Sequence, residues 1–129
     1  MSTTAISLLA ALFMAHFLGD FTPLATARMQ RAKASGGPMG PIAAHAAVHA
    51  ALVGLAVLLV ARPAPSVVAL AVLIELVSHF AIDAIRARLG TRLPVLSNPG
   101  SNPFWWALGV DQLLHGLVLI GIAATVLPH

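Results

Sequence analysis

The chain has 129 residues, of which 59% are hydrophobic and only 9% are charged. A soluble domain carries roughly 25% charged residues, so this composition excludes an ordinary water-soluble fold and favours an integral membrane protein. The net charge of +3 comes from basic residues that lie between the apolar segments, and we therefore expect no binding to nucleic acid. The chain contains no cysteine, which excludes disulfides, thiolate ligands and cysteine nucleophiles.

Four stretches are long and apolar enough to cross a bilayer, which takes roughly 20 residues. The predicted transmembrane helices cover residues 4–24, 42–61, 67–86 and 104–127. Residues 28–41 and 86–103 carry basic residues together with Gly and Pro breakers, and residues 62–66 are typical of a tight turn. We therefore predict an all-α fold in which residues 1–129 form a single domain, an integral membrane bundle of four transmembrane helices.

The basic residues predict how this bundle lies in the membrane. Six of the seven Lys and Arg residues are in the first and third loops. The positive-inside rule places those two loops in the cytoplasm, and both termini then lie outside.

All four acidic residues and five of the six histidines lie inside the hydrophobic segments, mostly four residues apart. The sets are His16/Asp20, His45/His49, Glu75/His79/Asp83 and Asp111/His115. Four residues are about one helical turn, so each set lines one face of its helix. Ionisable groups inside a membrane are costly and usually mark a functional site.

The predicted orientation brings the four sets to a similar depth in the cytoplasmic half of the bilayer. A deeper layer is expected to contain His16, His49, His79 and His115. The layer nearer the cytoplasm is expected to contain Asp20, His45, Asp83 and Asp111. Glu75 falls about one turn deeper than the histidine layer.

A short internal similarity connects the two halves of the chain. Residues 16–20 have the sequence HFLGD and residues 79–83 have the sequence HFAID. Each is followed by a basic loop and then by a helix that opens with a polar pair four residues apart. This pattern predicts a parallel repeat of two hairpins, related by an axis along the membrane normal.

Imidazole nitrogens and carboxylate oxygens together suit a divalent transition metal, and Zn is our first expectation. The candidate ligands are His16, Asp20, His45, His49, His79, Asp83, Asp111 and His115. These exceed the needs of one tetrahedral ion, which leaves open either one metal with outer carboxylates that orient the histidines or two metals. The alternative is an unmetallated polar core that holds helices together or relays protons. Asp20 and Asp111 are nearer the interface, where hydration alone also explains them.

If the protein is an enzyme, the plausible mechanism is metal-assisted hydrolysis. A metal would lower the pKa of a bound water, and Glu75 or Asp83 would act as general base. A site at this depth suits a lipid-like substrate presented from the inner leaflet. Two other functions stay open: a small transporter of metal ions or protons, and a structural subunit of a membrane complex. So small a bundle is also a candidate for homo-oligomerisation or for pairing with a membrane partner protein.

Four motifs carry a resemblance to a known family. They are residues 15–21 (AHFLGDF), His45 with His49, residues 79–83 (HFAID) and residues 111–115 (DQLLH). Their order resembles a family of small bacterial membrane proteins catalogued as domain of unknown function 3307. The chain departs from the family pattern after Asp20, where residues 21–24 (FTPL) replace a stretch that often contains Gln. The resemblance implies a multi-pass protein of the bacterial inner membrane and supplies no activity.

Overall fold

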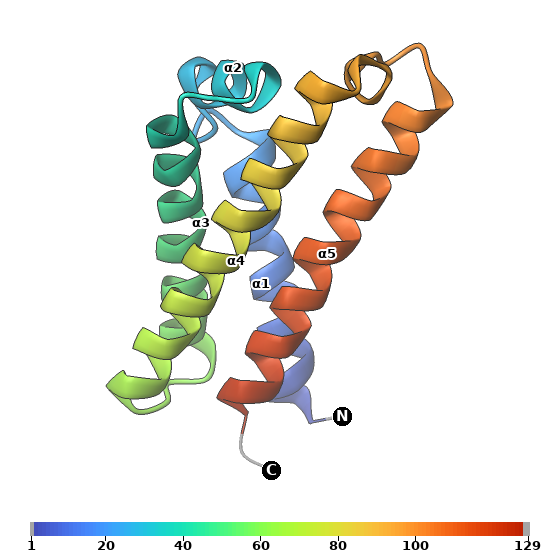
Figure 1. The fold of residues 1–129 in the computed structure, drawn as a ribbon. Helices are drawn as coiled ribbons and strands as arrows, with labels where there is room; N and C mark the ends of the chain where they lie inside the picture. Colours follow the sequence, from blue (N-terminus) through green and yellow to red (C-terminus); the bar gives the residue numbers. More distant parts are fainter. Residues whose placement is uncertain (1, 128–129) are drawn as a thin grey trace.

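A computed structural model describes residues 2–127 of the chain. Within this range the chain forms five α-helices and one short 3₁₀ helix, and no strand. In chain order they are α1 (Thr3–Phe21), α2 (Ala27–Ser35), α3 (Met39–Val60), α4 (Pro65–Arg92), η1 (Pro94–Ser97) and α5 (Asn102–Val126). The four long helices run side by side, and α2 lies across one end of the bundle (Figure 1). The start of α1 and the end of α5 lie at the opposite end (Figure 1).

The predicted membrane bundle is confirmed. Each of α1, α3, α4 and α5 is long and apolar enough to cross a membrane. Their outward faces carry large apolar side chains, among them Leu59, Leu73, Val77 and Leu113, which are 55–63% exposed. A soluble protein seldom leaves so continuous an apolar surface uncovered, whereas lipid tails cover it without cost.

The helices begin and end where local chemistry dictates. The hydroxyl oxygens of Ser2, Thr26 and Ser101 each accept a hydrogen bond from the backbone N–H three residues further on, which satisfies a donor of the first turn. Pro65 begins α4, where its missing N–H costs nothing. Helix α2 ends at Gly36, whose φ of 76° is in the left-handed region.

Two parts of the chain differ from the prediction. Residues 28–41 were expected to form a loop, but most of them lie in α2 and in the first turn of α3. The stretch between the Thr26 cap and Gly36 consists largely of good helix formers, and these outweigh its polarity. Helix α4 also continues six residues past the predicted end at residue 86, because no proline interrupts it before Pro94.

The interior of the bundle has an apolar half and an ionisable half. Fully buried apolar side chains fill the half near the termini; they include Leu8, Leu12, Val53, Val57, Leu119 and Ile122. Along each long helix the same buried face then continues toward the α2 end with the His and Asp sets. The apolar core therefore closes the end of the bundle near the termini. The ionisable sets of the four long helices lie together toward the other end.

The two hairpins of the predicted repeat differ from each other in the structure. Helices α1 and α3 form one hairpin, and α4 and α5 form the other. Helix α2 interrupts only the first hairpin, however, and η1 only the second. Contact between α3 and α4 is also more extensive than contact between α1 and α5. The repeat stays a prediction.

Candidate metal centre

The structure brings all the predicted site residues into one cluster at the α2 end of the bundle. Eight of the nine residues of this cluster are buried, and the side chain of the ninth, Asp20, is only 8% exposed. The five histidine rings are contiguous: His79 has its ring centroid 3.8 Å from that of His49 and 4.2 Å from that of His115. His45 and His16 lie next to this trio, with centroids 4.6 Å and 5.1 Å from His49.

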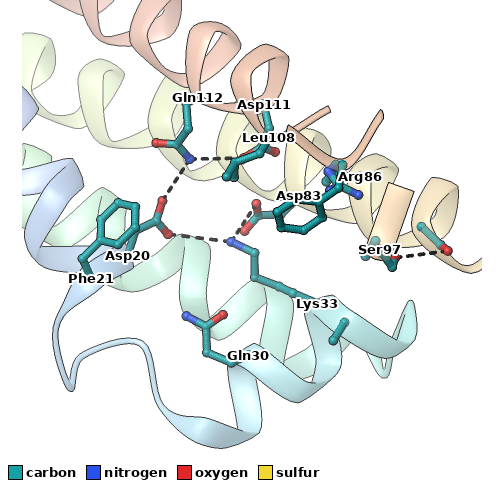
Figure 2. Close-up of a pocket in the computed structure, with 14 residues that line it drawn as sticks. Asp20, Phe21, Gln30, Lys33, Asp83, Arg86, Ser97, Leu108, Asp111 and Gln112 are labelled. Carbon is teal, nitrogen blue, oxygen red and sulfur yellow. Dashed lines mark hydrogen bonds and ion pairs between the residues drawn. The ribbon is translucent and has the colours of Figure 1, made fainter. Parts of the chain in front are cut away.

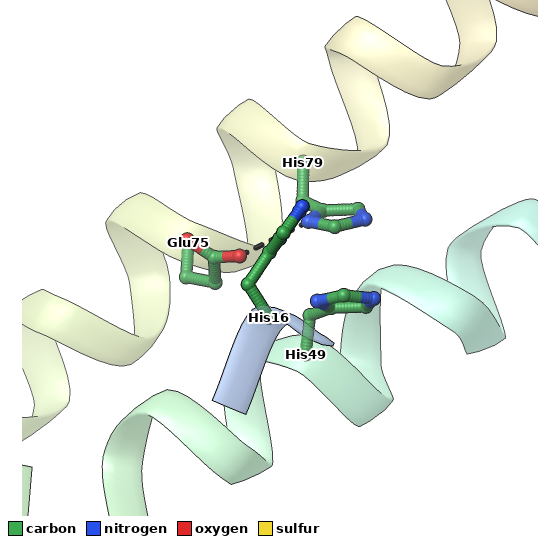
Figure 3. A group of neighbouring side chains, drawn as sticks. All are labelled: His16, His49, Glu75 and His79. Atoms are coloured by element: carbon green, nitrogen blue, oxygen red, sulfur yellow. Dashed lines mark hydrogen bonds and ion pairs between the residues drawn. The ribbon is translucent and has the colours of Figure 1, made fainter. Parts of the chain in front are cut away.

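Three overlapping sets of these residues offer ligand atoms within 4.8 Å of one another. The sets are His16/His49/Glu75/His79, Asp20/His45/His49/His79 and His79/Asp83/His115. His79 belongs to all three. Figure 3 shows the first set, in which the rings of His16, His49 and His79 converge beside Glu75. Of the residues predicted as ligands and described here, Asp111 is the one that joins no set.

Hydrogen bonds determine which nitrogen each of two histidines presents to the centre. His79 Nδ1–H donates to Glu75 Oε1 at 3.0 Å, and His115 Nδ1–H donates to the Asp111 carbonyl oxygen at 2.8 Å. We assign the ring protons on these partners, since both are acceptors. Each ring therefore keeps a lone pair on Nε2, the arrangement that oriented metal-ligating histidines show.

Those two Nε2 atoms lie close to the same carboxylate. Asp83 Oδ2 lies 3.5 Å from His79 Nε2, and Asp83 Oδ1 lies 3.9 Å from His115 Nε2. The two Nε2 atoms are fully buried and make no hydrogen bond. Buried acceptor nitrogens without a hydrogen bond are costly unless a cation binds them. Two imidazoles and one carboxylate are also a familiar ligand set for a divalent metal.

Asp20 organises the neighbouring part of the cluster. Its Oδ1 accepts a hydrogen bond from His45 Nε2–H at 3.0 Å and lies 3.4 Å from His49 Nε2. His16 Nε2 lies 3.3 Å from Asp20 Oδ2. The Asp20 carboxylate therefore joins helices α1 and α3. The sequence had left open whether Asp20 is a metal ligand or is simply hydrated.

Gln112 links the two halves of the cluster. Its Oε1 accepts a hydrogen bond from His16 Nε2–H at 3.2 Å. Its Nε2 donates to Asp111 Oδ2 at 3.2 Å and to Asp20 Oδ2 at 3.5 Å. A residue beside Asp111 with no assigned role in the sequence thus holds two carboxylates and a histidine in place.

Lys33 is the site residue that sequence reasoning missed. Its ammonium lies 3.1 Å from Asp83 Oδ1, 3.7 Å from Asp20 Oδ1 and 3.4 Å from His45 Nε2. It reaches these groups because α2 folds back across the end of the bundle. The sequence did contain a signal for this residue. The Thr26 cap and the helix formers before Gly36 favour a helix there, and Lys33 is the one lysine of the chain.

A cavity of about 430 Å³ opens beside the cluster. Figure 2 shows three carboxylates facing it, those of Asp20, Asp83 and Asp111, with Lys33 and Gln112 between them. No histidine is among the residues that line the cavity. The carboxylates therefore separate the histidines from the opening, and a small molecule that enters meets the carboxylates first.

Gly19 supports the cluster by being small. A Cβ at this position would fall on the imidazole ring of His49. We expect Gly19→Ala to displace that ring, which packs against His79, and to weaken metal binding by about tenfold or more while the helices stay folded. Metal titration with circular dichroism on the same samples checks this. Gly121→Ala is the matched control, because nothing lies within 4 Å of its added Cβ. Unchanged binding by the Gly19 variant would contradict the packing argument.

A known protein family matches this chain. A family model described as "Protein of unknown function (DUF3307)" covers residues 8–129, nearly the whole chain and all four motifs that carry the resemblance. No curated protein and no solved structure matches the chain. The extent of the family match confirms the resemblance seen in the order of the His and Asp motifs. The chain belongs to the DUF3307 family.

Proposed function

We propose that this protein is a membrane-embedded metalloprotein that hydrolyses a lipid-like substrate, with His79, Asp83 and His115 as the principal ligands. The observation that carries the metal is the pair of Nε2 lone pairs, oriented by Nδ1 hydrogen bonds and buried against Asp83. Zn²⁺ is the favoured ion, because two imidazoles and one carboxylate are a donor set typical of catalytic zinc sites. We place the protein in a bacterial inner membrane with α2 toward the cytoplasm, on the strength of its basic loops.

The residues around the centre suit distinct roles in hydrolysis. A divalent ion held by these residues would supply a nucleophilic water at neutral pH. Glu75 does not line the cavity and instead holds His79, so we assign it an orienting role in place of general base. We assign Asp83 as a metal ligand and not as the general base. Asp111 lines the cavity and its Oδ1 is buried without a hydrogen-bond partner, which makes Asp111 the better candidate for accepting the proton of the attacking water.

The packing favours hydrolysis over transport. A carrier needs a polar route to both sides of the membrane, whereas Leu8, Leu12, Val53, Leu119 and Ile122 are at most 1% exposed and fill the other half of the bundle. A site that opens at one end and is closed by apolar side chains at the other suits binding and chemistry. The role of a structural subunit has no specific observation in its favour.

Elemental analysis of the detergent-purified protein is the direct test. We expect about one equivalent of a transition metal in the wild type and its loss in His79→Ala, since His79 belongs to every candidate ligand set. Ser78→Ala is the matched control: its hydroxyl donates to the backbone carbonyls of Ile74 and Glu75 in its own helix and bonds to no side chain of the cluster. Metal-loaded protein is then assayed for hydrolysis of phospholipids and lipid phosphates. A wild type that stays free of metal after reloading would refute the metal site.

A further inference from the structure

A second, apolar groove lies on the outside of the bundle between α4 and α5. Its volume is about 370 Å³, and its walls include Ile85, Leu89, Leu96, Trp106, Val110 and Leu114. Most of these side chains are well exposed; Trp106, for example, is 69% exposed. Both helices are long and apolar enough to span a membrane, and a groove on the outside of such a bundle would face lipid.

The groove meets the polar cavity at two charged residues. Arg86 and Asp111 line both the groove and the cavity. Arg86 Nη2 donates to the Leu96 carbonyl oxygen at 2.9 Å, which holds the guanidinium at this junction. An amphipathic molecule lying along α4 and α5 would therefore have its apolar part against the groove and its polar part beside Arg86, facing the cavity.

We propose that the groove binds an acyl chain of an anionic phospholipid, whose phosphate lies beside Arg86 at the mouth of the cavity. The apolar walls of the groove suit a hydrocarbon tail, and the guanidinium suits a phosphate. The carboxylates of Asp20, Asp83 and Asp111 repel a phosphate unless a divalent ion neutralises them. The inference therefore rests on the proposed function, and it names the substrate class of that site.

Trp106 provides a reporter inside the groove. The chain has two tryptophans, so Trp105→Phe leaves Trp106 as the sole one. The protein is reconstituted in dioleoyl phosphatidylcholine bilayers that contain a small fraction of lipid brominated on its acyl chains near the headgroup. Bromine quenches tryptophan fluorescence on contact. Titration with brominated phosphatidic acid and with brominated phosphatidylcholine then gives the preference for the anionic lipid.

We expect metal-loaded protein to prefer phosphatidic acid about fivefold, which is the contribution of roughly one basic residue near a membrane surface. Ala107→Phe fills the groove and should abolish this preference, because Ala107 is one of its lining residues. Gly109→Phe adds the same aromatic ring to α5 where nothing lies within 4 Å and should retain it. Arg86→Gln should lower the preference, and Arg86→Lys should retain part of it.

Metal content is measured on the same samples, so that the two proposals fail separately. Equal quenching by both lipids in metal-loaded wild type, or an unchanged preference in Ala107→Phe, would overturn the lipid inference and leave the metal site intact. A preparation that takes up no metal would overturn the proposed function and this inference with it.

Discussion

Asp83→Asn is expected to remove the metal from the purified protein and to weaken metal binding by at least about 100-fold, more than the loss of an outer orienting group costs. Asp83 is fully buried, and its two oxygens lie 3.5 Å and 3.9 Å from the Nε2 atoms of His79 and His115. Asparagine keeps the shape of the side chain and removes its charge. The affinity is measured by competition with a chromophoric chelator, and the folded state by circular dichroism.

Asp111→Asn is the matched comparison for this prediction. The chemical change is identical and the residue is also at the cavity, but Asp111 belongs to none of the candidate ligand sets. Its backbone carbonyl, which accepts the hydrogen bond from His115 Nδ1, is unaffected by the substitution. We expect metal affinity within about tenfold of wild type and the loss of hydrolysis. Equal metal loss in both variants would contradict the assignment of Asp83 as ligand and Asp111 as base.

Lys33→Met is expected to act in the opposite direction and to tighten metal binding. The Lys33 ammonium lies 3.1 Å from Asp83 Oδ1, so it neutralises the carboxylate that a divalent ion needs and repels that ion. Its side chain is 22% exposed, and solvent screening reduces the repulsion. The gain in affinity should still be about tenfold. The same chelator competition measures it, and a slower loss of metal to excess chelator should accompany it.

Two variants of the same helix make this result specific. Lys33→Arg keeps the charge and should leave the affinity near that of wild type. Arg31→Met removes one positive charge from the exposed side of α2, and its effect should be small because exposed charges are screened. If Lys33→Met weakened metal binding instead, Lys33 would be a support of the site and not a competitor of the metal.

The membrane bundle could be predicted from the sequence because the signal is local. A run of about 20 apolar residues has one stable solution in lipid, a helix, and α1, α3, α4 and α5 follow it closely. The clustering of the ionisable sets could be predicted for a related reason. Pairs four residues apart share a helix face, and alternating helix directions bring the sets on α1 and α4 to the same end as those on α3 and α5.

Other features depended on contacts between segments far apart in the chain. Helix α2 is short and polar, so hydropathy gives no sign of it, and its lysine enters the site only because the helix folds across the bundle. Spacing alone likewise suggested that Glu75 acts as a base, whereas its hydrogen bond to His79 and its distance from the cavity suit an orienting group. Gln112 gained its role from His16 and Asp20 on α1, and Asp111 gained its role from its place in the lining of the cavity.

The sequence by itself determined the number of membrane helices and the residues that must avoid lipid, because burial in a membrane acts on each segment separately. Only the tertiary structure decided which nitrogen each histidine presents, which carboxylates face the opening and where Lys33 lies. Those properties follow from the rotation of each helix about its axis and from the path of α2, and both are determined by packing between helices. The apolar groove between α4 and α5, with Arg86 and Asp111 at its junction with the cavity, is a product of the same packing.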